Sequence, residues 1–113
     1  MNTTSTEPTI NRAPETAVID LEADERNTAL AATIRHHLSR GCVHLVLDLR
    51  ELRMLDSERI GALIMYKKMA RDLGGDLHLL KPRGRVKEVL DAVNLGAVFG
   101  VFEQETAARA AFQ

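Results

Sequence analysis

One stretch of the chain, residues 42–49, constrains the fold more than any other. It runs from Cys42 to Leu49 as CVHLVLDL, and most of its residues are apolar whichever side they would face. A strand that is apolar on both faces is typical of the centre of a parallel sheet, where other elements cover both sides. The sequence therefore predicts a buried central strand here, and the rest of the chain must supply the elements that cover it.

Shorter signals before and after this strand alternate between strand and helix. Apolar runs predict further strands over residues 17–21 and 76–81, and a short last strand or turn over 98–102. Helical spacing of apolar residues predicts helices over residues 24–40, 56–73, 85–93 and 103–112. Strands that alternate with helices at this spacing form crossover connections. We therefore predict an α/β fold, a small sandwich with a mainly parallel central sheet and helices packed after the strands.

The length and charge of the chain bound its organisation. Its 113 residues, 45% of them hydrophobic, suit one domain with a real core. Residues 1–16 are polar and proline-punctuated, so we expect a flexible tail or weak edge strand there and a single domain over 17–113. A formal net charge of −1 gives no footprint for nucleic acid. With neither a membrane-length apolar run nor a secretory apolar segment, we expect a cytoplasmic protein without membrane insertion.

Residue types that carry chemistry form no catalytic or metal-binding pattern. The histidines have no suitably spaced carboxylate or thiolate beside them, and we expect all four at the surface or at strand ends: His36, His37, His44 and His78. The single Cys42 excludes an internal disulfide. Glycine-rich phosphate-binding motifs and a serine nucleophile elbow are absent from the sequence. We therefore expect no enzyme activity, no cofactor and no metal.

The most informative stretch joins the central strand to the next helix. The buried strand ends at Leu49, a short polar loop follows, and Asp56-Ser57 opens a helix. Ligands of open α/β sheets bind outside the carboxyl ends of the strands, which is where this loop begins. Ser57 lies where an N-cap or first-turn residue belongs. Serine is a favoured N-cap, so this position has a purely structural explanation beside a functional one.

Helical geometry gives this helix two unlike sides. At 100° per residue, the predicted core side carries Ala62, Leu63, Tyr66, Met69, Ala70 and Leu73. The charged side carries a stripe of Ser57, Ile60, Ile64 and Lys68. Single exposed apolar residues are common on protein surfaces. Two isoleucines in line behind a hydroxyl group also suit a partner-binding surface, and both interpretations stay open here.

The motifs of the chain, taken in order, resemble the STAS domain of bacterial anti-sigma factor antagonists. The resemblance spans Ala17 to Phe112. It rests on the segments VLDL at 46–49, MLDS at 54–57, IGAL at 60–63, GGDL at 74–77, VKEVL at 86–90 and NLGAVF at 94–99. Each segment is short, but their order and spacing together are specific.

The resemblance implies a regulatory function. In phosphorylatable members, the serine after an aspartate is the target of an anti-sigma factor that is also a serine kinase. Asp56 and Ser57 match that pair. The unphosphorylated antagonist binds the kinase, the phosphorylated form lets go, and a serine phosphatase resets it. The implied phosphorylation site is Ser57, and the expected partner-binding residues are Asp56, Ser57, Glu58, Arg59, Ile60, Ile64 and Lys68.

The chain departs from the family pattern directly after the serine. Members usually continue with a small hydroxyl residue and glycine, whereas this chain has Glu58 and Arg59. The alternative is therefore a non-phosphorylated STAS interaction module that acts as a scaffold or transporter-associated subunit.

Overall fold

Parallel strands form the centre of the molecule. The computed structural model describes residues 16–21 and 27–112. Within them, four strands form one sheet in the order β1-β2-β3-β4, with every neighbouring pair parallel. The strands are β1 (Thr16–Asp20), β2 (His44–Asp48), β3 (Asp76–Leu80) and β4 (Gly100–Phe102). The prediction of an α/β fold with a parallel sheet around a buried β2 is confirmed.

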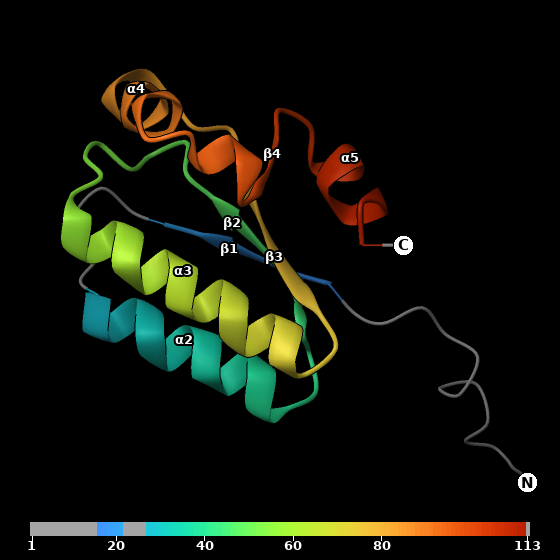
Figure 1. Cartoon of the computed structure of the whole chain (residues 1–113). Helices are drawn as coiled ribbons and strands as arrows, with labels where there is room; N and C mark the ends of the chain where they lie inside the picture. Colours follow the sequence, from blue (N-terminus) through green and yellow to red (C-terminus); the bar gives the residue numbers. More distant parts are fainter. Residues whose placement is uncertain (1–15, 22–26, 113) are drawn as a thin grey trace, which may run out of the picture.

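Helices follow the strands in the predicted order (Figure 1). They are α2 (Asn27–Ser39), α3 (Ser57–Asp72), α4 (Gly84–Ala92), the short 3₁₀ helix η1 (Leu95–Ala97) and α5 (Glu105–Ala110). The predicted start of the first helix at Asp24 lies outside the described residues, as does the expected tail over 1–15. Thr16, assigned to that tail from the sequence, is the first residue of β1.

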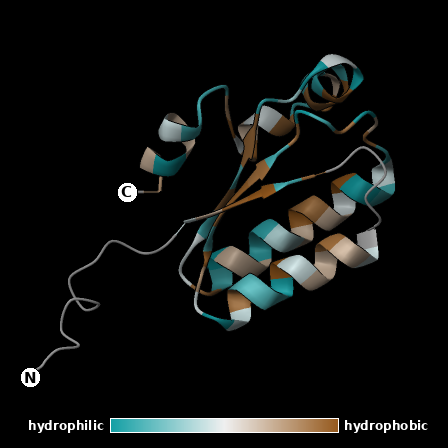
Figure 2. Ribbon diagram, turned by 180° about the vertical axis from the view of Figure 1, so that it is seen from behind, coloured by the Kyte–Doolittle hydropathy of each residue, from teal (hydrophilic) through white to brown (hydrophobic). Residues whose placement is uncertain are grey.

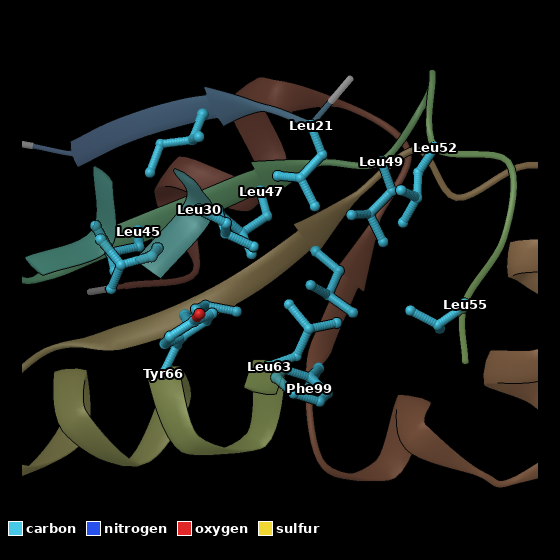
Figure 3. Close-up of a cluster of buried hydrophobic side chains, with 14 of the residues drawn as sticks. Leu21, Leu30, Leu45, Leu47, Leu49, Leu52, Leu55, Leu63, Tyr66 and Phe99 are labelled. Atoms are coloured by element: carbon cyan, nitrogen blue, oxygen red, sulfur yellow. The ribbon is translucent and has the colours of Figure 1, made fainter. Parts of the chain in front are cut away.

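The two faces of the sheet are covered unequally. Leu45 and Leu47 of β2 belong to a large cluster with residues of α2, α3 and α4. In Figure 3 these two leucines lie on the side of the sheet that faces Leu63 and Tyr66 of α3. Val46 points to the opposite face, where, among residues 16–21 and 27–112, it forms a small cluster with the fully buried Leu80 and Ala108. Figure 2 shows the strands as the most hydrophobic part of the fold.

Both long helices stop at a glycine in the same way. Gly74 has φ +92° after α3, and its N–H donates to the carbonyl of Arg71 while the next N–H, of Gly75, donates to Ala70. This is a Schellman motif, which needs a left-handed residue at that position. Gly75 has a second role, because a Cβ there would lie 1.9 Å from the carbonyl oxygen of Val43. These two glycines end α3 directly after the predicted helix of residues 56–73.

The segment between α4 and α5 is more compact than the sequence predicts. Asn94, which follows α4, adopts the left-handed conformation, with φ 56°. The short strand or turn predicted over 98–102 is confirmed: Val98 and Phe99 form a turn after η1, and the chain pairs with β3 from Gly100. Phe99 is nevertheless buried in the large cluster. Its burial explains the apolar signal of this turn.

Candidate partner-binding site

The loop that precedes Ser57 is fixed at both of its ends. Where β2 ends, the buried carboxylate of Asp48 accepts a hydrogen bond from the Arg50 N–H at 2.9 Å. Leu52 and Leu55 are buried in the large cluster and hold the rest of the loop against the core (Figure 3). The residues between these anchors face solvent, among them Met54, which is 68% exposed. The alternation of buried leucines and exposed residues therefore delivers Asp56 and Ser57 to the surface at a defined position.

Asp56, and not Ser57, caps helix α3. The backbone of Asp56 is extended, and its Oδ1 accepts the N–H of Arg59 at 2.8 Å. An N-cap aspartate of this kind stabilises a helix by about 1 kcal/mol. Ser57 is the first helical residue, is exposed, and its hydroxyl makes no hydrogen bond within the described part of the chain. The purely structural explanation of Ser57 as the cap is therefore wrong, because its neighbour has that role.

Several charged residues lie near Ser57 in the sequence. Asp56 and Glu58 are exposed and bring two carboxylates to the start of α3, where the helix dipole favours negative charge. Arg53 lies exposed in the preceding loop. Arg59 is half-buried and turns toward Tyr66. Burial raises the pKa of the Tyr66 hydroxyl, and the nearby charges of Arg35 and Arg59 act against that increase.

The outward side of α3 carries an apolar surface that differs from the predicted stripe. Ile64 is 44% exposed and Met65 is 54% exposed. Ile60 is half-buried and packs against the large cluster, so its predicted place on the solvent side is wrong. The reason is angular: Ile60 lies only about 60° around the helix from buried Leu63. We call the exposed residues Met54, Ser57, Gly61, Ile64, Met65 and Lys68 the α3 surface.

Several members of the α3 surface were missed by sequence reasoning. Met65 follows Ile64, and 100° steps place it about 160° around the helix from buried Leu63, so the same wheel could have found it. Lys68 forms a 3.1 Å ion pair with Asp72, one turn further along. Gly61 lies in the middle of the surface, and nothing is within 4 Å of a Cβ built there. Leu73, predicted on the core side, is 57% exposed because it caps the end of the helix.

The inward side of α3 is tied to the sheet by charge as well as by packing. Lys67 and Arg71 both form ion pairs with Asp76, the first residue of β3. Asp76 also accepts the Leu77 N–H at 2.8 Å. Burial alone would raise the pKa of Asp76, but the hydrogen bonds from Lys67 and Leu77 together hold it below its usual value. This anchor fixes the rotation of α3, and with it the direction in which the α3 surface faces.

Other concave and polar regions lie away from this surface. A hollow of about 310 Å³ is lined by Thr16, Ala17, His36, His37, Arg40 and Cys42. An open groove of about 540 Å³ runs between the last turns of α2 and α3, with Leu38, Met69 and Leu73 among its walls. Within residues 16–21 and 27–112, no group of three His, Cys, Asp or Glu side chains is placed to hold a metal ion. The same residues include no helix long and apolar enough to cross a membrane.

Comparison with protein families settles the relationship that the motifs indicate. A family model described as "Mlab, STAS domain" matches residues 9–101. The chain belongs to this STAS domain family. A search among curated proteins found no match to this STAS domain.

Solved structures show the same fold for this STAS domain. The crystal structure of TM1081 from Thermotoga maritima, named as a candidate anti-sigma factor antagonist, is similar with a TM-score of 0.74 and 19% identity, covering 86% of each chain. The NMR structure of TM1081 gives a TM-score of 0.72 at 18% identity, covering 84% of this chain and 79% of that one. At such low identity the likeness establishes the arrangement of strands and helices, and the function has to be argued from the site.

Proposed function

We propose that this STAS domain is an anti-sigma factor antagonist that binds an anti-sigma factor with serine kinase activity through the α3 surface. Phosphorylation of Ser57 controls the binding. The observation that carries this proposal is the division of roles at the start of α3. Because Asp56 caps the helix, the Ser57 hydroxyl is exposed and without a hydrogen bond in the described residues. It is therefore accessible to a kinase at no cost to the fold.

The remaining expected partner contacts surround that hydroxyl. Asp56 and Glu58 flank it in sequence, and Arg59 and Ile60 complete the first turn as half-buried residues at its edge. Ile64 and Lys68 extend the contact along the outward side of the helix. An interface of this kind has apolar residues at its centre and charged residues at its rim, which is the usual composition of a protein–protein contact.

A phosphate on Ser57 would act on the interface and not on the core. It adds about −1.5 to −2 charges at neutral pH, and a helix N-terminus accepts such a group. Asp56 and Glu58 add to the negative charge that the partner then meets, and Arg53 offsets part of it. A partner surface that closely covers Ser57 loses affinity through repulsion and bulk, while the buried residues of α3 stay in place.

The test is phosphorylation by a panel of purified anti-sigma factors with kinase domains, in the presence of ATP. Intact mass should increase by one phosphate, phosphopeptide mapping should place it on Ser57, and a Ser57→Ala variant should stay unmodified but still bind. The serine phosphatase of the same system should restore binding. Modification elsewhere in the chain, with Ser57 unmodified, would sink the phosphorylation part of the proposal.

A second candidate is a STAS interaction module without phosphorylation, a scaffold or transporter-associated subunit. Glu58 favours it, because an exposed carboxylate next to Ser57 gives the site a permanent negative charge. The description of the matching family, "Mlab, STAS domain", names no anti-sigma factor. A chain that resists every kinase in the panel, and that binds its partner equally well as Ser57→Ala and Ser57→Asp, supports this second role.

A further inference from the structure

The face of the sheet opposite α2 and α3 has a thin cover. Its buried hydrophobic residues within the described chain are Val46, Leu80 and Ala108, with Val18, Phe102 and Phe112 half-buried beside them. Ala108 lies in α5, a helix of six residues, and Phe112 follows that helix. Figure 1 shows α5 beside β4. A cover this short has few buried contacts, and such segments open at a low free-energy cost compared with the core strands.

His78 lies beneath this cover, in the middle of β3. Its side chain is 6% exposed, so the prediction of a surface or strand-end position is wrong for this histidine. The ring of Phe112 stacks on it with centroids 4.1 Å apart, and Phe102 approaches edge-on at 5.3 Å. Gly100 on β4 leaves the necessary room, because a Cβ there would lie 2.8 Å from the His78 Nδ1. Phe112 also reaches the ring of His44 on β2 at 4.7 Å.

The His78 ring is buried as an uncharged group. Both ring nitrogens are inaccessible to solvent, and neither has a hydrogen-bond partner among the described residues. A protonated ring would carry a charge into this buried site, where the nearest acceptors are the backbone groups of Leu77 and Ala111 and neither makes a hydrogen bond of good geometry, which is strongly unfavourable. Contact between the imidazolium and the aromatic rings would offset part of the free-energy cost of burying this charge. Burial is the largest cause and lowers the pKa of His78. The charge of Asp76 opposes it, Lys67 lowers the pKa further, and the backbone groups of Ala111 and Leu77 raise it by smaller amounts, so that the net direction is down.

The charged neighbours do not supply the missing partner. Asp76, on the same strand, is already held by Lys67 and Arg71 of α3. On α5, Glu105 and Arg109 pair with each other at 2.9 Å. On β2 the group on this side is His44 itself, and β4 presents only Gly100 and Phe102. Protonation of His78 can therefore be accommodated most easily if the ring gains access to water.

We propose that His78 is a pH-sensitive latch for the C-terminal segment: the neutral ring holds Phe112 and α5 on the sheet, and protonation releases them. Release uncovers Val46, Leu80 and Phe102 and lets water reach the imidazolium. The large cluster on the other face takes no part, so the sheet and the α3 surface stay intact. The device is independent of Ser57 and of the partner that binds there.

The sign of the pH dependence follows from the lowered pKa. Attachment of α5 is complete above the ordinary histidine value of about 6.5 and weakens as the pH falls from there toward the lowered pKa, below which it levels off. In that window, the equilibrium constant for release rises by up to about tenfold for each pH unit.

The experiment is an NMR titration of the full-length chain from pH 7.5 to 5.0, with hydrogen exchange at both ends. The Phe112 ring signals should lose their stacking shifts with the same midpoint as the His78 ring, below 6.5. Amides of residues 105–112 should lose protection while those of β2 keep it. His78→Phe, which retains an aromatic stack without a titrating group, should keep α5 attached at both pH values. His78→Leu serves the same purpose if the larger ring does not pack.

The contrary results are equally definite. A His78 titration that leaves the Phe112 signals unchanged overturns the latch, as does release of α5 that persists in the non-titrating variants. A parallel loss of protection in β2 means that the whole domain opens and that α5 is not a separate unit. His44→Gln is the matched control, and it should leave the midpoint of α5 release in place.

Discussion

Helix α3 has two sides with opposite tasks, and neighbouring residues fall on different ones. Leu63 is fully buried against the sheet, whereas Ile64 is 44% exposed. Tyr66 and Ala70 continue the inner side, and Met65 continues the outer. The inner residues are explained by the core. The outer apolar residues add little to it, and their position on the same helix as an exposed serine without a hydrogen bond is what supports the proposed partner binding.

The largest effect on stability is expected from a charged residue on the inner side of α3. Leu63→Asp should abolish folding. A small domain is stable by only about 5–15 kcal/mol, and burial of an unpaired carboxylate among leucines takes away most or all of that free energy. Circular dichroism and dispersion of the NMR spectrum measure the loss. Met65→Asp is the matched outer variant and should melt within a few degrees of the parent. A folded Leu63→Asp protein contradicts the assignment of the inner side.

A weaker effect is expected where the inner side is held by charge. Asp76→Asn removes the carboxylate shared by Lys67 and Arg71, and should lower the unfolding free energy by about 2 kcal/mol, the scale of a charged hydrogen bond. Denaturant unfolding measures it. Asp72→Asn, which breaks only the exposed pair with Lys68, is the control and should change stability by less than about 0.5 kcal/mol. Equal losses in both variants would show that α3 is not anchored through Asp76.

The same anchor predicts a pH dependence. The folded-state pKa of Asp76 is lowered from 3.8, so its contribution is complete above that value and disappears as the pH falls below it. Parent and Asp76→Asn stabilities should therefore converge between about pH 4 and pH 2. Denaturant unfolding at several pH values gives the difference. A gap between the two proteins that stays constant down to pH 2 contradicts the role of the ionised carboxylate.

The smallest expected effect is a gain on the outer side. Gly61→Ala should stabilise the domain by about 0.5–1 kcal/mol, because alanine is the better helix former and nothing lies within 4 Å of the added methyl group. Thermal melting measures it. A larger side chain at the same position should affect binding instead of stability. Gly61→Arg should fold but bind weakly if the partner closely covers the α3 surface. If Gly61→Ala is less stable than the parent, the assignment of Gly61 to open space on the outer side of α3 is wrong.

The fold could be predicted because its signals are local. Three short signals each indicate one structure. The run that is apolar on both faces forms β2, the glycine pair Gly74-Gly75 ends α3, and Asn94 takes a left-handed conformation after α4. The segment from Leu95 to Phe99 was harder, since burial of Phe99 against the core and strand formation leave the same apolar trace.

The local structure around the candidate site could be predicted only in part. The sequence located the start of α3, yet it could not decide whether Asp56 or Ser57 was the cap, because both are good caps and the choice depends on one hydrogen bond to Arg59. Ile60 was misplaced because a wheel gives angles but not where the core boundary lies. Burial of His78 depends on Phe112, more than thirty residues later in the chain, and no local pattern encodes that contact.

The central claim is that the α3 surface binds a partner without contributing to the fold, and one measurement addresses it directly. The affinity of Ile64→Asp for the anti-sigma kinase that binds the parent should fall by at least about 30-fold, the loss expected for a hot-spot residue of about 2 kcal/mol. Its melting temperature should stay within a few degrees of the parent's, because Ile64 is already 44% exposed. A folded Ile64→Asp protein that binds with undiminished affinity would contradict the account.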